Sequence, residues 1–346
     1  MTETKRYDYL DITKGLGILA VVWAHIMLVG WSHKVIYAFH MPLFFFISGM
    51  LFRRENYSSF VQFVGKRAKR LLVPYLVYSI VTWGIWAAFR WVRHDPVESY
   101  WAPLLQTFIA QGSGSFMVHN SALWFVPCLF VVELMYWGLS ALKEWLNVLV
   151  CFILAGLSFF FGHLWGDSYW HLLPFNFDAA IIALPFYSVG NVLMKHYSHK
   201  DLVDCVSNNR LTSLGILIVG TALLVIASFS FGECSMGSSS YQCNGAVFIV
   251  RAFLGSAMMI LFSLLFGASN ATKTLQQPFI WFGKNSLDVM CLHIPIKGVV
   301  MIVIARLLST GVDNLSSHWG GALLSFALTM VIASVVILFI NRFIRK

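Results

Sequence analysis

Long apolar runs separated by short polar segments dominate the chain. A helix that crosses a bilayer needs ~20 mostly apolar residues, and ten stretches approach or reach that length. The pattern therefore predicts an all-α fold, a polytopic membrane bundle of about ten helices that forms one domain over residues 1–346. The expected spans are about 11–30, 36–52, 71–91, 121–140, 146–163, 178–195, 211–230, 246–267, 287–308 and 319–341.

Two segments depart from the simple pattern. The second span is short for a full crossing, so it either lies in a thinned or water-filled region or begins before residue 36. The stretch 101–111 is too short to cross, and we expect an interfacial or re-entrant helix there.

Composition agrees with a membrane protein and excludes two other classes. Hydrophobic residues make up 58% of the chain and charged residues only 11%, whereas soluble domains carry ~25% charged residues. A soluble enzyme of this size would have to expose its 30 Phe and 13 Trp side chains. Intrinsic disorder is excluded as well, because it requires low hydrophobicity.

The position of the positive charges predicts the orientation of the bundle. Ten crossings place both termini on one side of the membrane. Of the 24 Lys and Arg residues, the loops on the other side hold only Lys34, Arg90 and Arg93. The positive-inside rule therefore makes both termini cytoplasmic. It also explains the net charge of +9 without a nucleic-acid partner.

The six cysteines show no metal-binding spacing, so we expect no metal site. Cys234 and Cys243 lie in one outward loop, where an oxidising exterior allows them to pair. The sequence therefore predicts a structural disulfide between them.

Ionisable residues within spans are costly and usually face a cavity or a partner. In the first span, Lys14 and His25 are eleven positions apart and differ by only ~20° around the helix axis, and Asp11 differs from His25 by ~40°. One face thus carries a carboxylate and an amine at the cytoplasmic end and an imidazole ~16 Å deeper. A histidine bonded only to a neighbouring helix is the structural alternative for His25.

Cations also gather at the cytoplasmic side of the second and third spans. His40 lies toward the outer half of the second span, which is followed by Arg53. The segment GKRAKRLLVPY then places Lys66, Arg67, Lys69 and Arg70 directly before the third. Such a cluster is typical of membrane anchoring at anionic lipid, but guanidinium groups also bind phosphates in bidentate fashion. With Lys14 and Arg53 on the same side, we favour a phosphate-bearing ligand from the cytoplasm.

The ninth span places two further cationic groups on one stripe, because Lys297 lies four residues after His293. Glu133 and Asp178 are carboxylates available to orient a histidine, and Arg251 is a candidate partner for either. Structural ion pairing is the alternative for each of these residues.

The chain resembles the acyltransferase 3 family of integral membrane acyltransferases, especially its fucose 4-O-acetylase-like branch. The resemblance runs through nearly the whole chain in order. It rests on the segments LDITKGLGILAVVWAH (10–25), FHMPLFFFISGMLF (39–52), KRAKRLLVPY (66–75), LWFVPCLF (123–130), LPFNFDAAIIALPFYSVGNVL (173–193) and FGKNSLDVMCLHIP (282–295).

This resemblance implies a bundle of about ten helices that transfers an acyl group, usually acetyl from acetyl-CoA, to a sugar hydroxyl. It implies that His25 is the family's first-helix histidine and that Arg67 and Arg70 match its RxxR pair. Asp11 and Lys14 match the motif at the start of the first helix, where many relatives carry Arg instead of Lys.

The resulting hypothesis is a membrane O-acyltransferase in the bacterial inner membrane, with acyl-CoA, membrane lipid and an envelope glycan or lipid-linked sugar as partners. Arg67, Arg70, Lys14 and Arg53 would hold the phosphates of acetyl-CoA, and a continuous polar path would lead to His25 as general base. His40, His293 or Lys297 would stabilise the oxyanion, and Glu133 or Asp178 would orient His25. A route through an acyl-histidine remains open.

The competing class is a proton-coupled transporter or flippase, because intramembrane His, Glu and Asp residues also build proton relays. Transporters often contain inverted repeats with broken helices, and the sequence shows no such symmetry. A purely structural subunit would explain neither the aligned face of the first span nor the buried cations.

Overall fold

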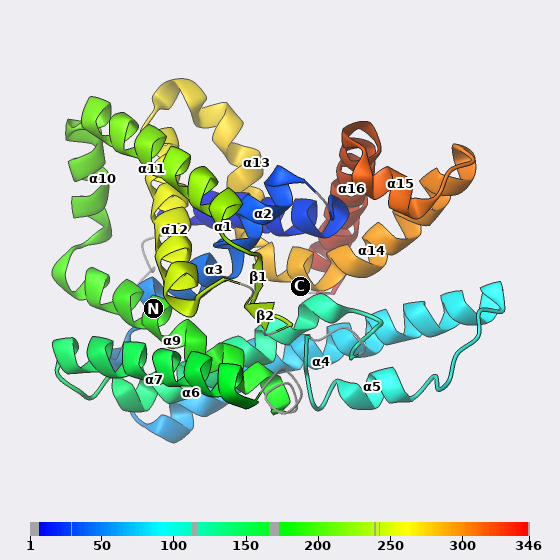
Figure 1. Ribbon diagram of the computed structural model, residues 1–346, viewed down its shortest axis with the longest axis horizontal. Coiled ribbons are helices and arrows are strands. Elements are labelled where there is room, and N and C mark those ends of the chain that lie inside the picture. Colours follow the sequence, from blue (N-terminus) through cyan, green and yellow to red (C-terminus); the bar gives the residue numbers. More distant parts are fainter. Residues whose placement is uncertain are drawn as a thin grey trace.

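A computed structural model describes residues 7–28, 30–112, 116–165, 173–238, 240–241 and 243–344. It confirms the all-α fold, because 10 helical segments of the described chain are long and apolar enough to cross a membrane (Figure 1). These segments are α1 (Asp8–Ile26), α2 with α3 (Trp31–Tyr37 and His40–Leu51), α4 (Phe60–Arg93), η2 with α6 (Ser121–Trp124 and Phe125–Leu139), α7 (Glu144–Trp165), η3 with α9 (Pro174–Asn176 and Phe177–His196), α11 (Arg210–Ser230), α12 (Gly245–Gly267), α14 (Ser286–Leu307) and α16 (Trp319–Phe343).

Shorter elements connect the spans. The 3₁₀ turns η1 (Arg54–Asn56) and η4 (Asn270–Thr272) precede α4 and α13. The two-residue strands β1 (Cys234–Ser235) and β2 (Ser240–Tyr241) pair antiparallel, with Cys234 opposite Tyr241. The other short helices are α5 (Ala102–Gln106), α10 (His199–Asn208), α13 (Lys273–Lys284) and α15 (Val312–Ser317). Helix α5 is the short, non-crossing helix expected within 101–111.

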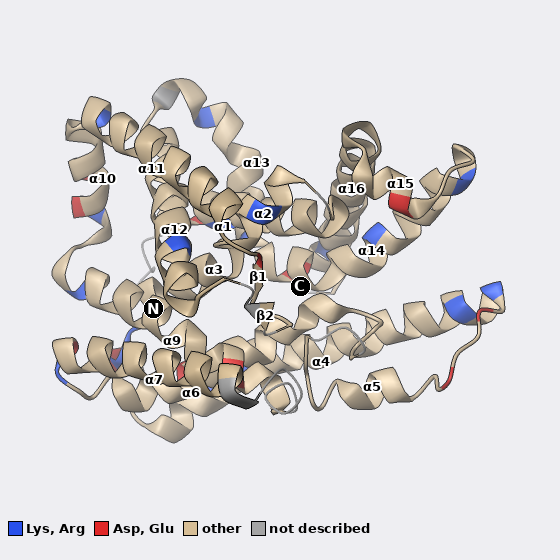
Figure 2. Ribbon diagram, viewed as in Figure 1, with Lys and Arg blue, Asp and Glu red and all other residues tan. Residues whose placement is uncertain are grey.

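The spans differ in burial and divide into central helices and peripheral helices that surround them. Within the hydrophobic window of each span, 67% of α1, 67% of α2–α3 and 72% of η3–α9 is buried, against 22–28% of α4, α7, α11 and α16. In a bilayer, only side chains that face lipid need to be apolar, so polar groups are concentrated in the centre. Figure 2 shows how little of the ribbon carries charge along the long helices.

Two elements differ from the predicted boundaries. Helix α4 begins at Phe60 rather than near residue 71, because the Ser59 hydroxyl accepts a hydrogen bond from the Gln62 N–H and caps an extra helical segment. The basic cluster is therefore helical. The segment 268–286, between the expected spans 246–267 and 287–308, contains the amphipathic helix α13. This helix buries Gln276, Ile280 and Gly283 at helical spacing and packs on α1.

Close backbone contacts hold the central helices together. A Cβ atom on Gly283 of α13 would collide with the Asp11 carbonyl oxygen of α1. One on Gly49 of α3 would collide with the Tyr187 carbonyl oxygen of α9. Small residues at such crossings let membrane helices approach each other closely. The contact at Gly283 therefore fixes the inner end of α1 against the α13–α14 corner.

The loop between α11 and α12 contains the predicted disulfide, which joins Cys234 and Cys243 across a Cα separation of 6.3 Å. Arg251 of α12 lies beneath this hairpin. Its guanidinium donates to the Gly232 carbonyl at 3.1 Å and lies 3.3 Å from the Cys234 sulfur, so it braces the hairpin instead of serving Glu133 or Asp178.

The contact between α1 and α13 predicts the effect of adding one methyl group. Gly283→Ala should destabilise the protein by about 1–3 kcal/mol, the usual cost of overpacking. Thermal unfolding in detergent, followed by tryptophan fluorescence, measures the change. The control is Gly298→Ala, because nothing lies within 4 Å of a Cβ at Gly298. Equal melting temperatures for the two variants would contradict the proposed close packing.

The disulfide predicts a difference in thiol reactivity. In unreduced, denatured protein, Cys234 and Cys243 should resist alkylation and gain the mass of two hydrogens on reduction. The exposed free thiol of Cys205 should alkylate without reductant and serves as the control. Peptide mass spectrometry measures both results, and alkylation of Cys234 before reduction would show that the disulfide is absent.

Candidate active site

A cavity of about 470 Å³ lies at the inner end of the bundle, at the start of α1, the end of α3, the start of α4 and the α13–α14 corner. The predicted topology places all of these chain positions on the same side of the membrane. Five basic residues contribute to its lining, namely Lys14, Arg53, Arg67, Arg70 and Lys284. The cavity therefore combines the positive charge and the size that an anionic ligand requires.

Helix α4 divides the basic cluster between two environments. Arg67 and Arg70, one turn apart, line the inner cavity, whereas Lys66 and Lys69 are exposed and lie outside its lining. The Lys66 ammonium instead lies over the Tyr57 ring, 5.4 Å from its centroid. Residues three apart share one helix face, so Arg67 and Arg70 line the cavity together while Lys66 and Lys69 lie outside it together.

Glu133 of α6 holds Arg67 in place. The Arg67 Nε and Nη2 atoms contact the two carboxylate oxygens of Glu133, which is fully buried. This bidentate pair fixes the guanidinium plane at the cavity wall. Glu133, which we had expected to be available for His25, is therefore engaged by Arg67.

The side chains of the remaining predicted cations differ in how firmly neighbouring groups hold them. The Lys14 ammonium contacts the Asp11 carboxylate at 3.0 Å, and Asp11 is only 2% exposed. Arg53 donates to the carbonyls of Met50 and Phe52 at 3.1 and 2.9 Å, so it caps the inner end of α3. The Arg70 side chain is exposed at the cavity rim.

The sequence analysis missed three residues of this cavity. Asp288 at the start of α14 is 3% exposed and accepts a hydrogen bond from the Tyr78 hydroxyl at 2.6 Å. The Tyr187 hydroxyl is buried without a hydrogen-bond partner among the described residues. Asp288 could have been found from the sequence, because it is an ionisable residue within an expected span. Lys284 and Tyr187 could be assigned to the cavity only once the positions of α13 and α9 were known.

A second cavity, of about 310 Å³, lies toward the outer side. His25 of α1 and His40 of α3 line it, together with Tyr37, Ser121 and Trp124. The hairpin residues 235–238 line it as well. The Asn176 amide donates to the Gly237 carbonyl at 2.9 Å, which connects the hairpin to η3. The structure thus brings both predicted histidines to one small chamber next to the disulfide-closed hairpin.

His293 and Lys297 of α14 adjoin His25. The His25 and His293 ring centroids are 5.2 Å apart, and the Lys297 ammonium donates to the His25 carbonyl at 2.8 Å. Nδ1 of His293 lies 2.8 Å from the Met290 carbonyl, and Nδ1 of His40 lies 2.9 Å from the Ile36 carbonyl. Because carbonyls only accept, we assign the proton of each neutral ring to Nδ1, which leaves Nε2 as the basic nitrogen.

Asp178 does not join this group. It is 1% exposed at the start of α9, where it lies close enough to Cys128 to interact electrostatically. Neither cavity lining contains it in the described part of the chain. The structure thus brings His25, His40 and His293 together and leaves Glu133 and Asp178 at other contacts.

The prediction of a continuous polar path is wrong for the described residues, because the polar space is divided into two cavities. Met290 of α14, only 3% exposed, contributes to the lining of both. Met290 is the one residue common to the two linings among the described residues, so the inner cavity and the His25 cavity adjoin there.

Two histidines outside the spans, the buried His119 and the half-buried His199, stay neutral at neutral pH. Burial lowers the pKa of His119, which precedes η2, to about 4. Burial and the nearby Arg53 charge lower the pKa of His199 in α10 to about 4 as well. At neutral pH, His199 therefore adds no positive charge beside the inner cavity.

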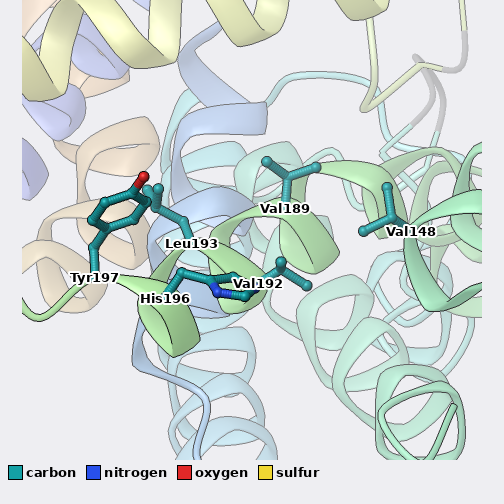
Figure 3. A pocket seen from close by; sticks show the side chains of 6 residues that line it. All are labelled: Val148, Val189, Val192, Leu193, His196 and Tyr197. Atoms are coloured by element: carbon teal, nitrogen blue, oxygen red, sulfur yellow. The ribbon is translucent and has the colours of Figure 1, made fainter. Parts of the chain in front are cut away.

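A further pocket, of about 540 Å³, lies between α7 and α9 (Figure 3). Its lining consists of Val148, Val189, Val192, Leu193, His196 and Tyr197. The His196 Nε2 atom lies 2.7 Å from a Glu144 carboxylate oxygen, so its ionisable side chain is already paired. This pocket does not share residues with the two cavities.

Comparison with known proteins places this arrangement in a family. A search of curated proteins and a search of solved structures found no match. A family profile described as an acyltransferase domain matches residues 7–340, which covers nearly the whole chain and every residue of the two cavities. The chain therefore belongs to the acyltransferase 3 family of membrane acyltransferases.

Proposed function

We propose that this membrane acyltransferase moves an acetyl group from cytoplasmic acetyl-CoA to a hydroxyl of an envelope sugar, glycan or lipid-linked oligosaccharide. The observation that carries the proposal is the placement of His25 in an outer chamber that adjoins the cationic inner cavity at Met290. Donor and acceptor would thus approach the same point from opposite sides of a bacterial inner membrane. The sequence resembles the fucose 4-O-acetylase-like branch of the family most, and this resemblance favours a sugar hydroxyl as the acceptor.

The inner cavity is the proposed donor site. Arg67 and Arg70 would bind the phosphates of acetyl-CoA, with Lys14 and Arg53 adding charge. The buried Glu133 keeps Arg67 from folding back into solvent, and Asp11 does the same for Lys14. Glu133 and Asp11 are therefore positioning residues in this scheme. The thioester end of the donor would point toward Met290.

His25 is the proposed general base. Its imidazole takes the proton of the acceptor hydroxyl as the oxygen attacks the thioester carbonyl. The C–S bond then breaks, and the imidazolium returns the proton to the departing CoA thiolate. No proton is gained or lost overall. A route in which the imidazole itself first accepts the acetyl group uses the same placement of His25.

The groups around His25 divide the remaining tasks. Lys297 holds the backbone of His25 against α14, so it is a positioning residue, and its ammonium is a candidate to stabilise the oxyanion. The basic Nε2 atoms of His293 and His40 favour accepting a proton or hydrogen bond over donating one. Asp178 interacts electrostatically with Cys128 of α6 and belongs to neither cavity lining, which favours a structural role for that carboxylate.

Removing the proposed base should abolish transfer. With purified protein in detergent, radiolabelled acetyl-CoA and a cell-envelope lipid extract, His25→Ala should lower the transfer rate by ~10²–10⁴-fold while CoA binding persists. His196→Ala, a histidine paired with Glu144 away from both cavities, should transfer at the parent rate. Undiminished transfer by His25→Ala would reject the base assignment. Absence of both transfer and CoA binding in the parent protein would favour the transporter alternative.

The separation of the basic cluster predicts a contrast between adjacent residues. Arg70→Ala should weaken acetyl-CoA binding by about 10–100-fold, the range for a lost charge-assisted hydrogen bond, with a smaller effect on kcat. Lys69→Ala removes the same charge outside the cavity lining and should bind the donor normally. Isothermal titration measures both affinities. Equal weakening by the two variants would instead support general electrostatic attraction.

A further inference from the structure

We propose that the Met290 side chain is a movable partition between donor and acceptor, which the acyl-bearing arm of the donor displaces and which otherwise keeps outer water from the thioester. This inference rests on the proposed function. It assigns to Met290 the preference for acyl transfer over hydrolysis.

The first argument is the position of Met290. Among the described residues, it contributes to both the 470 Å³ inner and the 310 Å³ outer cavity, and it is 3% exposed. On neighbouring elements too, residues that are close in sequence line different cavities. Trp124 lines the outer cavity and Phe125 the inner one, while Met41 and Phe44 divide in the same way on α3.

The second argument is that the surroundings of Met290 are fixed while its side chain is adaptable. The Met290 carbonyl accepts from the His293 ring at 2.8 Å, and the next carbonyl, that of Cys291, accepts from the Asn120 amide at 2.6 Å. The Phe44 and Phe125 rings pack edge to face, 5.9 Å apart. Methionine is unbranched and has three rotatable side-chain bonds, so it can move without displacing the helix.

The third argument is chemical. A base that activates a hydroxyl also activates water, and water that attacks the thioester carbonyl breaks the C–S bond to give acetate and the free CoA thiol. Excluding water until the acceptor is bound prevents this side reaction. An apolar side chain between His25 and the donor cavity would supply that exclusion.

Three variants test the partition through product ratios. Met290→Ala should raise acceptor-independent hydrolysis of acetyl-CoA by about tenfold or more and lower the ratio of transfer to hydrolysis. Met290→Ile, β-branched and stiff, should bind CoA but transfer about tenfold more slowly. Met301→Ala truncates a buried methionine of the same helix outside both cavities and should change neither rate. Unchanged hydrolysis in Met290→Ala, or parent-rate transfer by Met290→Ile, would overturn the proposal.

Side-specific labelling tests the partition without relying on catalysis. In a Cys205→Ser background, which removes the exposed free thiol, His25→Cys should react with a membrane-impermeant thiol reagent from the outer side only. Adding Met290→Ala should make it reactive from the inner side too. Inner-side reaction with Met290 intact, or none after its truncation, would refute the partition. If the labelling pattern is as expected but the parent protein transfers no acyl group, the proposed function is rejected while Met290 remains a barrier between the two cavities.

Discussion

The cost of placing a charge in hydrocarbon is the constraint on which this structure depends. It forces ionisable side chains of α1, α3, α4 and α14 toward the bundle interior, where they need partners or a solvated cavity. Glu133 meets this requirement by pairing with Arg67, and Asp11 by pairing with Lys14. The same requirement leaves the lipid-facing helices α7, α11 and α16 nearly free of charge. The two cavities follow from this sorting of polar and apolar residues.

Within that interior, the backbone is held rigidly by helix contacts and a disulfide, whereas a few side chains are free to adapt. Backbone contact at Gly283 and Gly49 locks α13 on α1 and α9 on α3, so the inner cations keep fixed relative positions. The hairpin closed by Cys234 and Cys243 and braced by Arg251 limits the outer chamber. This division would let the protein hold two substrates on opposite sides while a few side chains adapt, which suits group transfer across a membrane.

Much of this arrangement was predictable from the sequence because hydropathy and helical periodicity are strong signals in lipid. The ten spans and the disulfide follow from local patterns in the sequence, and the family resemblance pointed to Arg67 and Arg70 within the basic cluster. The contacts that each functional side chain makes with distant parts of the chain could not be predicted in this way. The Arg67–Glu133 pair joins residues 66 positions apart, and the His25–His293 contact depends on how α14 packs on α1. Helix α13 was not predicted, because an amphipathic segment of 12 residues is too short and too polar to be recognised as a membrane span. The division at Met290 required side-chain packing that no spacing rule contains.

The most direct test of the central claim is an experimental structure of the protein in lipid nanodiscs with CoA bound. The account predicts that the CoA phosphates contact Arg67 and Arg70, that the sulfur of the pantetheine arm reaches Met290, and that the His25 imidazole faces the same point from the outer chamber. Phosphates bound away from the inner cavity, or a His25 ring turned toward the lipid chains, would contradict it.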